Sequence, residues 1–124
     1  LDIHAWGLFP EDRAWLHQNI EHRFDWMLDH GAVEELQALR KHWTLSPNMS
    51  SMRCIGYRQI WSYLEGDITY ADMREQGIAA TRQLAKRQLT WLRSYPKVEL
   101  IDPAIQPITQ LAEQISCNLP ASNC

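Results

Sequence analysis

The sequence has few cysteines and no long apolar run. Cys54, Cys117 and Cys124 are an odd number without a C-x-x-C pair, which disfavours a disulfide framework and a structural zinc site. No apolar run approaches the roughly 20 residues of a membrane span, and the chain does not open on a basic and then apolar segment like a signal peptide. We therefore predict a reducing, cytoplasmic setting and no membrane association.

Short motifs that build known active sites are also missing. The sequence contains no G-x-G-x-x-G, G-x-x-x-x-G-K-[ST], G-x-S-x-G or H-E-x-x-H. None of its five histidines forms an i, i+4 pair on a helix, so surface histidines are favoured over metal ligands and we predict no metal site. Taken alone, the chain shows no complete active site.

What is present indicates a mainly α fold. The 124 residues are 45% apolar, which suits one folded domain over residues 1–124 with a frayed tail at 117–124. Helical periodicity predicts helices over about 10–30, 32–43, 70–95 and 103–115, with a short helix after Gly56. Pro10 suits a first helical position and Thr69 suits an N-cap. Residues 1–9 and 98–101 read as short strands that either pair with each other or lack their partners.

The net charge of −3 hides an uneven distribution. Residues 1–40 hold eight acids and three bases, whereas residues 76–97 hold five bases and no acid. Helical spacing predicts that Arg82, Lys86 and Arg93 share one face of the long helix, with Leu84, Trp91 and Leu92 on the other side against a core. A basic stripe on an acidic chain indicates a local anionic partner, and a solvated helix face is the simpler alternative.

Several other residues have two interpretations. Cys54, beside Arg53, is either a thiol with a lowered pKa or a small buried apolar residue, and we predict the latter. Trp61, Trp91 and Tyr63 are predicted to be core aromatics and not platforms for bases. Gly56 is predicted to serve backbone shape before ligand contact. Arginine and lysine with interspersed Gln and Thr donors suit phosphate oxygens, so RNA or a diphosphate is the natural ligand.

Several segments of the chain resemble those of a known family. Residues 53–59 (RCIGYRQ), 63–66 (YLEG) and 80–93 (ATRQLAKRQLTWLR), together with 16–24 (LHQNIEHRF), are similar to bacterial tRNA dimethylallyltransferases, the adenosine-37 isopentenyltransferases. The similarity covers about residues 1–102. It implies the helical C-terminal part of a P-loop kinase-like α/β enzyme.

The resemblance implies an activity and a set of site residues. Such an enzyme transfers a dimethylallyl group from dimethylallyl diphosphate to N6 of the adenosine that follows the anticodon. Arg23 resembles a catalytic arginine near the diphosphate, where a cation would stabilise the departing pyrophosphate. Two segments are implied to bind the tRNA anticodon stem-loop, the first bordering the adenosine pocket: Arg53, Cys54, Ile55, Gly56, Tyr57 and Arg58, and then Lys86, Arg87, Gln88, Leu89, Thr90, Trp91, Leu92 and Arg93.

The chain also departs from the family pattern. The phosphate-binding loop, the general base toward N6 and the helical insertion are absent, and Asn19 stands where the family usually has arginine. We therefore expect nucleotide, ATP and Mg²⁺ binding only in the intact enzyme, which is predicted to be a monomer, and inactivity of this chain alone, with dimerisation through an orphan strand possible. Two alternatives stay open: a free-standing helical RNA-binding module without catalysis, and a structural domain whose stripe is merely solvated.

Overall fold

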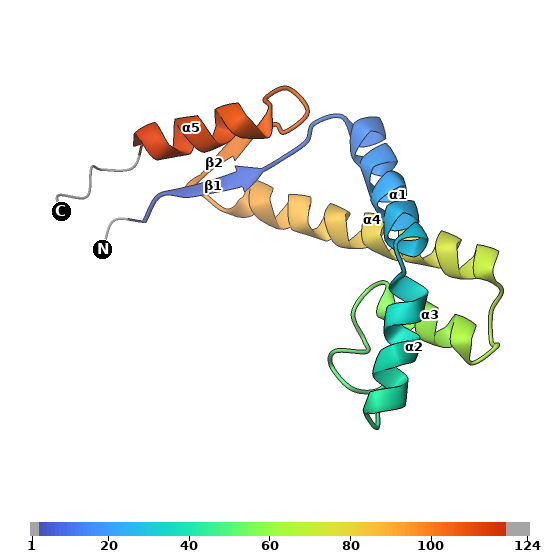
Figure 1. Cartoon of the computed structure of the whole chain (residues 1–124). Coiled ribbons are helices and arrows are strands. Elements are labelled where there is room, and N and C mark those ends of the chain that lie inside the picture. Colours follow the sequence, from blue (N-terminus) through green and yellow to red (C-terminus); the bar gives the residue numbers. More distant parts are fainter. Residues whose placement is uncertain (1–2, 119–124) are drawn as a thin grey trace. The chain divides into compact units, whose positions relative to one another are not determined.

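The computed structural model describes residues 3–118, and their architecture is mainly helical, as predicted. The elements follow the chain as β1 (Ala5–Leu8), α1 (Arg13–Asp29), α2 (Ala32–His42), α3 (Tyr57–Leu64), α4 (Tyr70–Ser94), β2 (Val98–Ile101) and α5 (Ile108–Asn118) (Figure 1). They fall into two compact units. We call residues 17–87 the middle unit, and residues up to 16 together with those from 88 onward the terminal unit.

Local side-chain chemistry sets the helix ends. The long helix α4 begins where predicted, because the Thr69 hydroxyl accepts the backbone N–H of Asp72 at 3.1 Å while the Asp72 carboxylate accepts the Thr69 N–H at 3.2 Å. The Thr69 hydroxyl also donates to the Asp72 carboxylate at 2.7 Å, and this bond, together with the one from the Thr69 N–H, lowers the pKa of Asp72. Gly31, with φ of 96°, separates α1 from α2 in the left-handed conformation that glycine adopts without strain.

Two predicted helix starts were wrong. Helix α1 begins at Arg13 and not at Pro10, because Asp12 is the residue whose carboxylate accepts the N–H of Ala14, at 2.9 Å. Helix α5 begins five residues later than predicted. Asp102 accepts the N–H of Ala104 at 2.9 Å and so holds a turn that competes with the helix.

The two strands form a parallel pair within the terminal unit, which confirms one of the two options that the sequence left open. Ala5 pairs with Val98 and Leu8 with Ile101, and the pairing extends to Phe9, whose N–H donates to the Ile101 carbonyl at 2.8 Å. The chain returns to this pair through four helices, as a parallel connection requires a long crossover. Ile101 and Leu111 are buried in this unit. The predicted frayed tail lies outside the described residues from 119 onward, while Cys117 and Asn118 end α5.

The middle unit depends on a close approach between α1 and α4. Ile20, Phe24 and Leu28 form the buried stripe of α1. Phe24 lies against Gly77 of α4 so tightly that a Cβ atom there would stand 2.1 Å from the Phe24 ring. Only a residue without a side chain lets the two helices meet at this distance, although glycine inside a helix costs about 1 kcal/mol in helix propensity.

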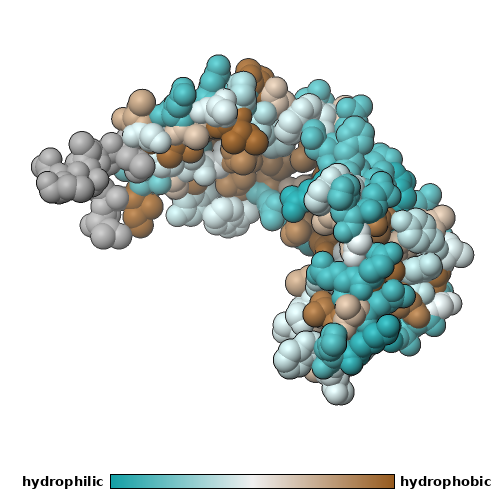
Figure 2. Space-filling view, in the orientation of Figure 1, coloured by the Kyte–Doolittle hydropathy of each residue, from teal (hydrophilic) through white to brown (hydrophobic). Residues whose placement is uncertain are grey.

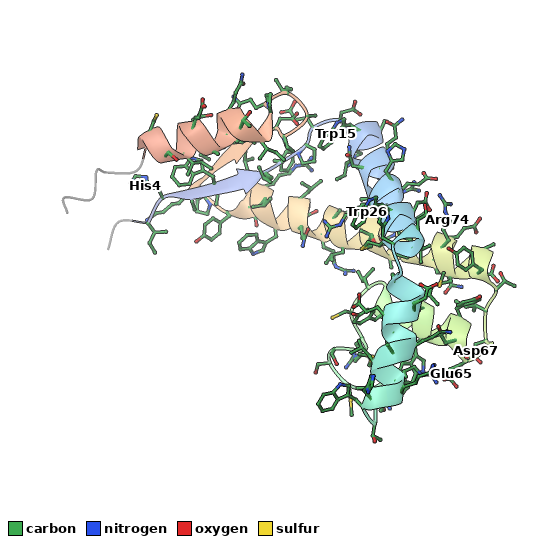
Figure 3. The ribbon with its side chains drawn as sticks, viewed as in Figure 1. His4, Trp15, Trp26, Glu65, Asp67 and Arg74 are labelled. Atoms are coloured by element: carbon green, nitrogen blue, oxygen red, sulfur yellow. The ribbon has the colours of Figure 1, made fainter. Side chains whose placement is uncertain are left out.

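Beside this contact, Arg74 of α4 binds two carboxylates of α1 (Figure 3). Its Nε and one terminal nitrogen donate to the two Asp25 oxygens at 2.5 and 2.7 Å, and the same terminal nitrogen reaches Glu21 at 2.8 Å. This fork suits the planar guanidinium group. Its hydrogen bonds lower the pKa of Asp25 and raise that of Arg74, so both groups stay charged over the ordinary pH range.

Gly77→Ala should destabilise the chain by about 2 kcal/mol, because overpacking a tight contact outweighs the gain in helix propensity. Thermal or urea unfolding followed by circular dichroism measures the change. Gln76→Ala, at an exposed position of the same helix, is the matched control and should stay within about 0.5 kcal/mol of the parent. Adding Phe24→Leu to Gly77→Ala should cost less than the sum of the single changes. A Gly77→Ala chain as stable as the parent would contradict this account of the helix contact.

Candidate nucleic-acid interface

The first predicted tRNA-binding segment, residues 53–58, enters helix α3 through Gly56. This residue has φ of 98°, and its N–H donates to the Gln59 side chain at 2.9 Å. A Cβ atom at Gly56 would meet nothing within 4 Å, so the backbone angle and not crowding requires glycine. Arg53 and Arg58 flank this bend and are exposed. Neither forms an ion pair with any residue between 3 and 118.

The prediction of a buried Cys54 was wrong. Its side chain is exposed, and its sulfur lies 3.8 Å from the Ser50 carbonyl oxygen. Ile55 beside it is 36% exposed. In the same loop Met52 is buried instead, at 3% exposed.

Tyr57 anchors this segment to helix α2. Its hydroxyl donates a hydrogen bond to the Glu35 carboxylate. This hydrogen bond, with partial burial, raises the pKa of Tyr57 to about 12. The start of α3 is therefore tied to α2 in the protonated state of Tyr57, while the arginines on either side remain turned toward solvent.

The second predicted segment, residues 86–93, continues α4. Lys86, Arg87, Gln88, Thr90, Trp91 and Arg93 are exposed, and Leu89 and Leu92 are half-buried. The prediction that Trp91 anchors a core was wrong, because its side chain is 59% exposed and stacks on Tyr95 with ring centroids 5.0 Å apart. The covered side of α4 contains Ile78, Ala85 and Leu92 at intervals of seven, and Trp91 lies about 100° away from it.

The basic stripe on α4 is shorter than the spacing suggested. Arg82 is half-buried and lies 3.8 Å from Glu21 of α1, four residues after the buried Ile78. Its guanidinium is therefore directed to the helix contact and not to the exposed face with Lys86. Arg93 lies in the terminal unit with its guanidinium 5.0 Å from the centroid of the Phe9 ring, a cation–π contact that leaves its charge at the surface.

The proposed catalytic Arg23 lies on α1, exposed and without an ion pair to the described residues. None of the contacts described for residues 3–118 joins it to segment 53–58 or to segment 86–93. Within the same range, no three His, Cys, Asp or Glu side chains come together as a metal ion would need. No described helix is long and apolar enough to cross a membrane.

A set of residues that sequence reasoning did not select surrounds a hollow of about 420 Å³ where α2 ends beside α3. We call it the α2–α3 hollow. It is lined by Arg40, Lys41, His42, Trp43, Thr44, Leu45 and Trp61. The sequence does contain a sign of this surface in the consecutive residues 40–43 (RKHW). The count of charges ended at residue 40, which separated Arg40 from Lys41 and hid the run.

Known proteins share both the sequence and this structure. The family model described as IPP transferase matches residues 1–95. The chain belongs to the IPP transferase family. The tRNA dimethylallyltransferase of Legionella pneumophila (strain Lens) is 61% identical over 89 residues, which are 72% of this chain and 28% of that protein. That of Ralstonia pickettii is 49% identical over 119 residues, 94% of this chain and 36% of that protein.

Solved structures with a similar fold come from the same family as the sequence relatives. The tRNA Δ(2)-isopentenylpyrophosphate transferase of Staphylococcus epidermidis matches with a TM-score of 0.84 at 28% identity, over 94% of this chain and 37% of that one. The full-length tRNA isopentenylpyrophosphate transferase of Bacillus halodurans matches with a TM-score of 0.79 at 28% identity, over 90% and 36%. The family that the sequence segments suggested is thereby confirmed. The chain spans about a third of the length of these relatives.

The Tyr57 hydrogen bond makes stability depend on pH in the alkaline range. Because its pKa is raised from 10.0 to about 12 on folding, the bond stabilises the fold below pH 10 and this contribution is lost as the pH rises toward 12. Tyr57→Phe should therefore cost about 1 kcal/mol at neutral pH. That cost should shrink as the pH rises from 10 to 12.

Urea unfolding of both chains between pH 7 and 12 measures this difference. The difference in tyrosinate absorbance between the parent and Tyr57→Phe reports the pKa of Tyr57 directly. Tyr63→Phe is the control, since no hydrogen bond of the Tyr63 hydroxyl is described. An ordinary pKa for Tyr57 would contradict the hydrogen bond to Glu35.

Proposed function

We propose that this chain is the tRNA-contacting part of a prenyltransferase. The intact enzyme transfers a dimethylallyl group from dimethylallyl diphosphate to N6 of adenosine 37, the nucleotide 3′ to the anticodon. The family match over residues 1–95 supports the proposal, because those residues include both predicted tRNA-binding segments, 53–58 and 86–93. Its cytoplasmic location and the monomeric state of the intact enzyme remain predictions.

The exposed cations support a role in binding the anticodon stem-loop. Arg53 and Arg58 are exposed on either side of the bend at Gly56, and Arg87 is exposed on the continuous helix α4. Guanidinium groups positioned in this way suit phosphate oxygens, which fix the register of an RNA. Segment 53–58 would then border the pocket that receives the extruded adenine. The proposal assigns the contact with the stem to segment 86–93.

Arg23 is proposed to act on the diphosphate. Ionisation of the allylic C–O bond leaves the electron pair on pyrophosphate, and a cation directed at that charge lowers the barrier. N6 of adenosine attacks the allylic carbon and then loses a proton to a base that this chain lacks. Residues 3–118 bring together no ligand set for a metal ion, so we propose that Mg²⁺ and nucleotide binding belong to the part of the enzyme that this chain does not span.

A free-standing RNA-binding module is the second candidate, because it would use the same exposed cations without catalysis. Catalytic competence separates the two candidates. A chimaera of the Legionella pneumophila relative, in which the matching 89 residues are replaced by those of this chain, should transfer dimethylallyl groups to tRNA. The chain alone should transfer none.

Incorporation of labelled dimethylallyl groups into a tRNA transcript, with adenosine 37 or guanosine 37, measures the reaction. In the chimaera, Arg23→Gln should lower kcat by at least about tenfold, whereas Arg13→Gln, at an exposed position on the same helix, should leave it unchanged. A folded but inactive chimaera would favour the binding module. Transfer by the isolated chain would overturn the assignment of the base to the missing part.

RNA binding by the chain itself tests the interface. Arg87→Ala should weaken binding of an anticodon stem-loop, and the combined Lys86→Gln and Arg87→Gln change should flatten the dependence of log K on log salt. Each lost phosphate contact lowers that slope by roughly 0.7 to 0.9. Arg13→Gln is the matched control. Stem-loop binding that is unchanged in the double variant would support a merely solvated stripe.

A further inference from the structure

The α2–α3 hollow has no part in the function proposed above. It lies within the middle unit, where α2 ends and the chain turns into the loop that leads to α3. At about 420 Å³ it falls within the roughly 300–1,000 Å³ of common small-ligand sites. Figure 2 shows that the visible surface over α2 is mostly hydrophilic.

The lining is positively charged. Arg40, Lys41 and His42 follow one another at the end of α2, and no carboxylate is among the lining residues. Glu65, which directly follows α3 and is labelled in Figure 3, forms an ion pair with Arg40. This pair neutralises one cation and holds it in place, while Lys41 forms no ion pair with residues 3–118. An anionic group is therefore the ligand that the hollow favours.

Two tryptophans add aromatic surface to the lining of the hollow. Trp61 of α3 is half-buried, and the Arg40 guanidinium lies over its ring at 4.2 Å from the centroid. Trp43 follows the end of α2 in extended backbone and is 67% exposed, compared with 59% for Trp26 and for Trp91. A planar group stacked on Trp43 would cover this exposed ring beside Lys41.

The cations have a simpler role, since positive side chains in the last turn stabilise a helix by offsetting the dipole at its C-terminus. That role explains Arg40 and Lys41, but it requires neither a hollow nor an exposed tryptophan next to them. The combination of a cation and a free aromatic face is the one that binds a phosphate together with its nucleobase.

The hollow also lies next to one of the segments that are proposed to bind RNA. Arg58, in the first predicted tRNA-binding segment, precedes Trp61 by three residues on α3, and residues at this spacing are neighbours on one side of a helix. An RNA strand held by Arg58 would therefore meet the side of α3 that lines the hollow.

We propose that the α2–α3 hollow binds one nucleotide of the substrate RNA next to the strand held by Arg58, with the phosphate at Lys41 and the base on Trp43. This inference rests on the proposed function. Arg40 contacts both Trp61 and Glu65 at the wall of the hollow. The hollow thereby extends the proposed RNA contact beyond the two segments predicted from the sequence.

Binding of a whole tRNA transcript to the full chain over a range of salt concentrations tests the proposal. Lys41→Gln should lower the slope of log K against log salt by roughly 0.7 to 0.9, the value for one phosphate contact. Trp43→Ala should weaken binding about tenfold and Trp43→Phe much less, because a phenyl ring still stacks. Lys97→Gln and Trp26→Ala, at exposed positions elsewhere, are the matched controls and should bind as the parent does.

The outcomes separate the two proposals. If Lys41→Gln and Trp43→Ala lower the melting temperature while tRNA binding stays unchanged, the cations serve only the helix dipole and the inference is overturned. If the Lys86 and Arg87 variants weaken binding and the hollow variants do not, the inference fails while the proposed function stands. If the parent chain binds no tRNA, both fail.

A free nucleotide would present the same chemistry as a nucleotide of an RNA strand, and a competition experiment distinguishes these sources. Millimolar AMP should displace little tRNA from the parent chain, because one nucleotide alone lacks the contacts at Arg58 and Arg87. Displacement by micromolar AMP that Trp43→Ala abolishes would overturn the assignment to RNA and show a free nucleotide as the ligand.

Discussion

The contact of Phe24 with the bare backbone of Gly77 is the constraint on which the middle unit depends. It brings α1 and α4 close enough for Arg74 to reach both Asp25 and Glu21. An exposed ion pair contributes little by itself, but here the geometry is bidentate and is maintained by a packed aromatic ring. The apolar contact sets the distance between the helices, and the ion pairs then favour one arrangement of the polar groups beside it.

This contact also decides which cations remain available to a partner. The α4 residues Arg74 and Arg82 point toward the acids of α1, whereas Arg87, further along the same helix, is exposed. The acids of residues 17–29 are thus partly matched by cations within the fold. Exposed cations remain in segments 53–58 and 86–93 and at the end of α2, and also at Arg13, Arg23 and Lys97.

Much of the fold follows from local sequence patterns. The predicted bounds of α2, α4 and β2 differ from the observed ones by one residue or less, because Gly31, Thr69 and Pro96 terminate or cap these elements by short-range chemistry. The starts of α1 and α5 were missed for the same kind of reason. Asp12 and Asp102 accept nearby backbone N–H groups, and a competition between neighbouring caps is decided by differences that residue type alone does not reveal.

The sequence by itself determined the helical content, the family and the two polar segments, because each depends on residue type at a fixed spacing along one chain. Tertiary structure alone decided that Trp91 and Cys54 are exposed, that Arg82 faces Glu21 and that residues 40–43 surround a hollow with Trp61. Helical periodicity places a residue on a face of its own helix. Which face is then covered depends on the neighbouring elements, and these meet only after distant parts of the chain have packed together.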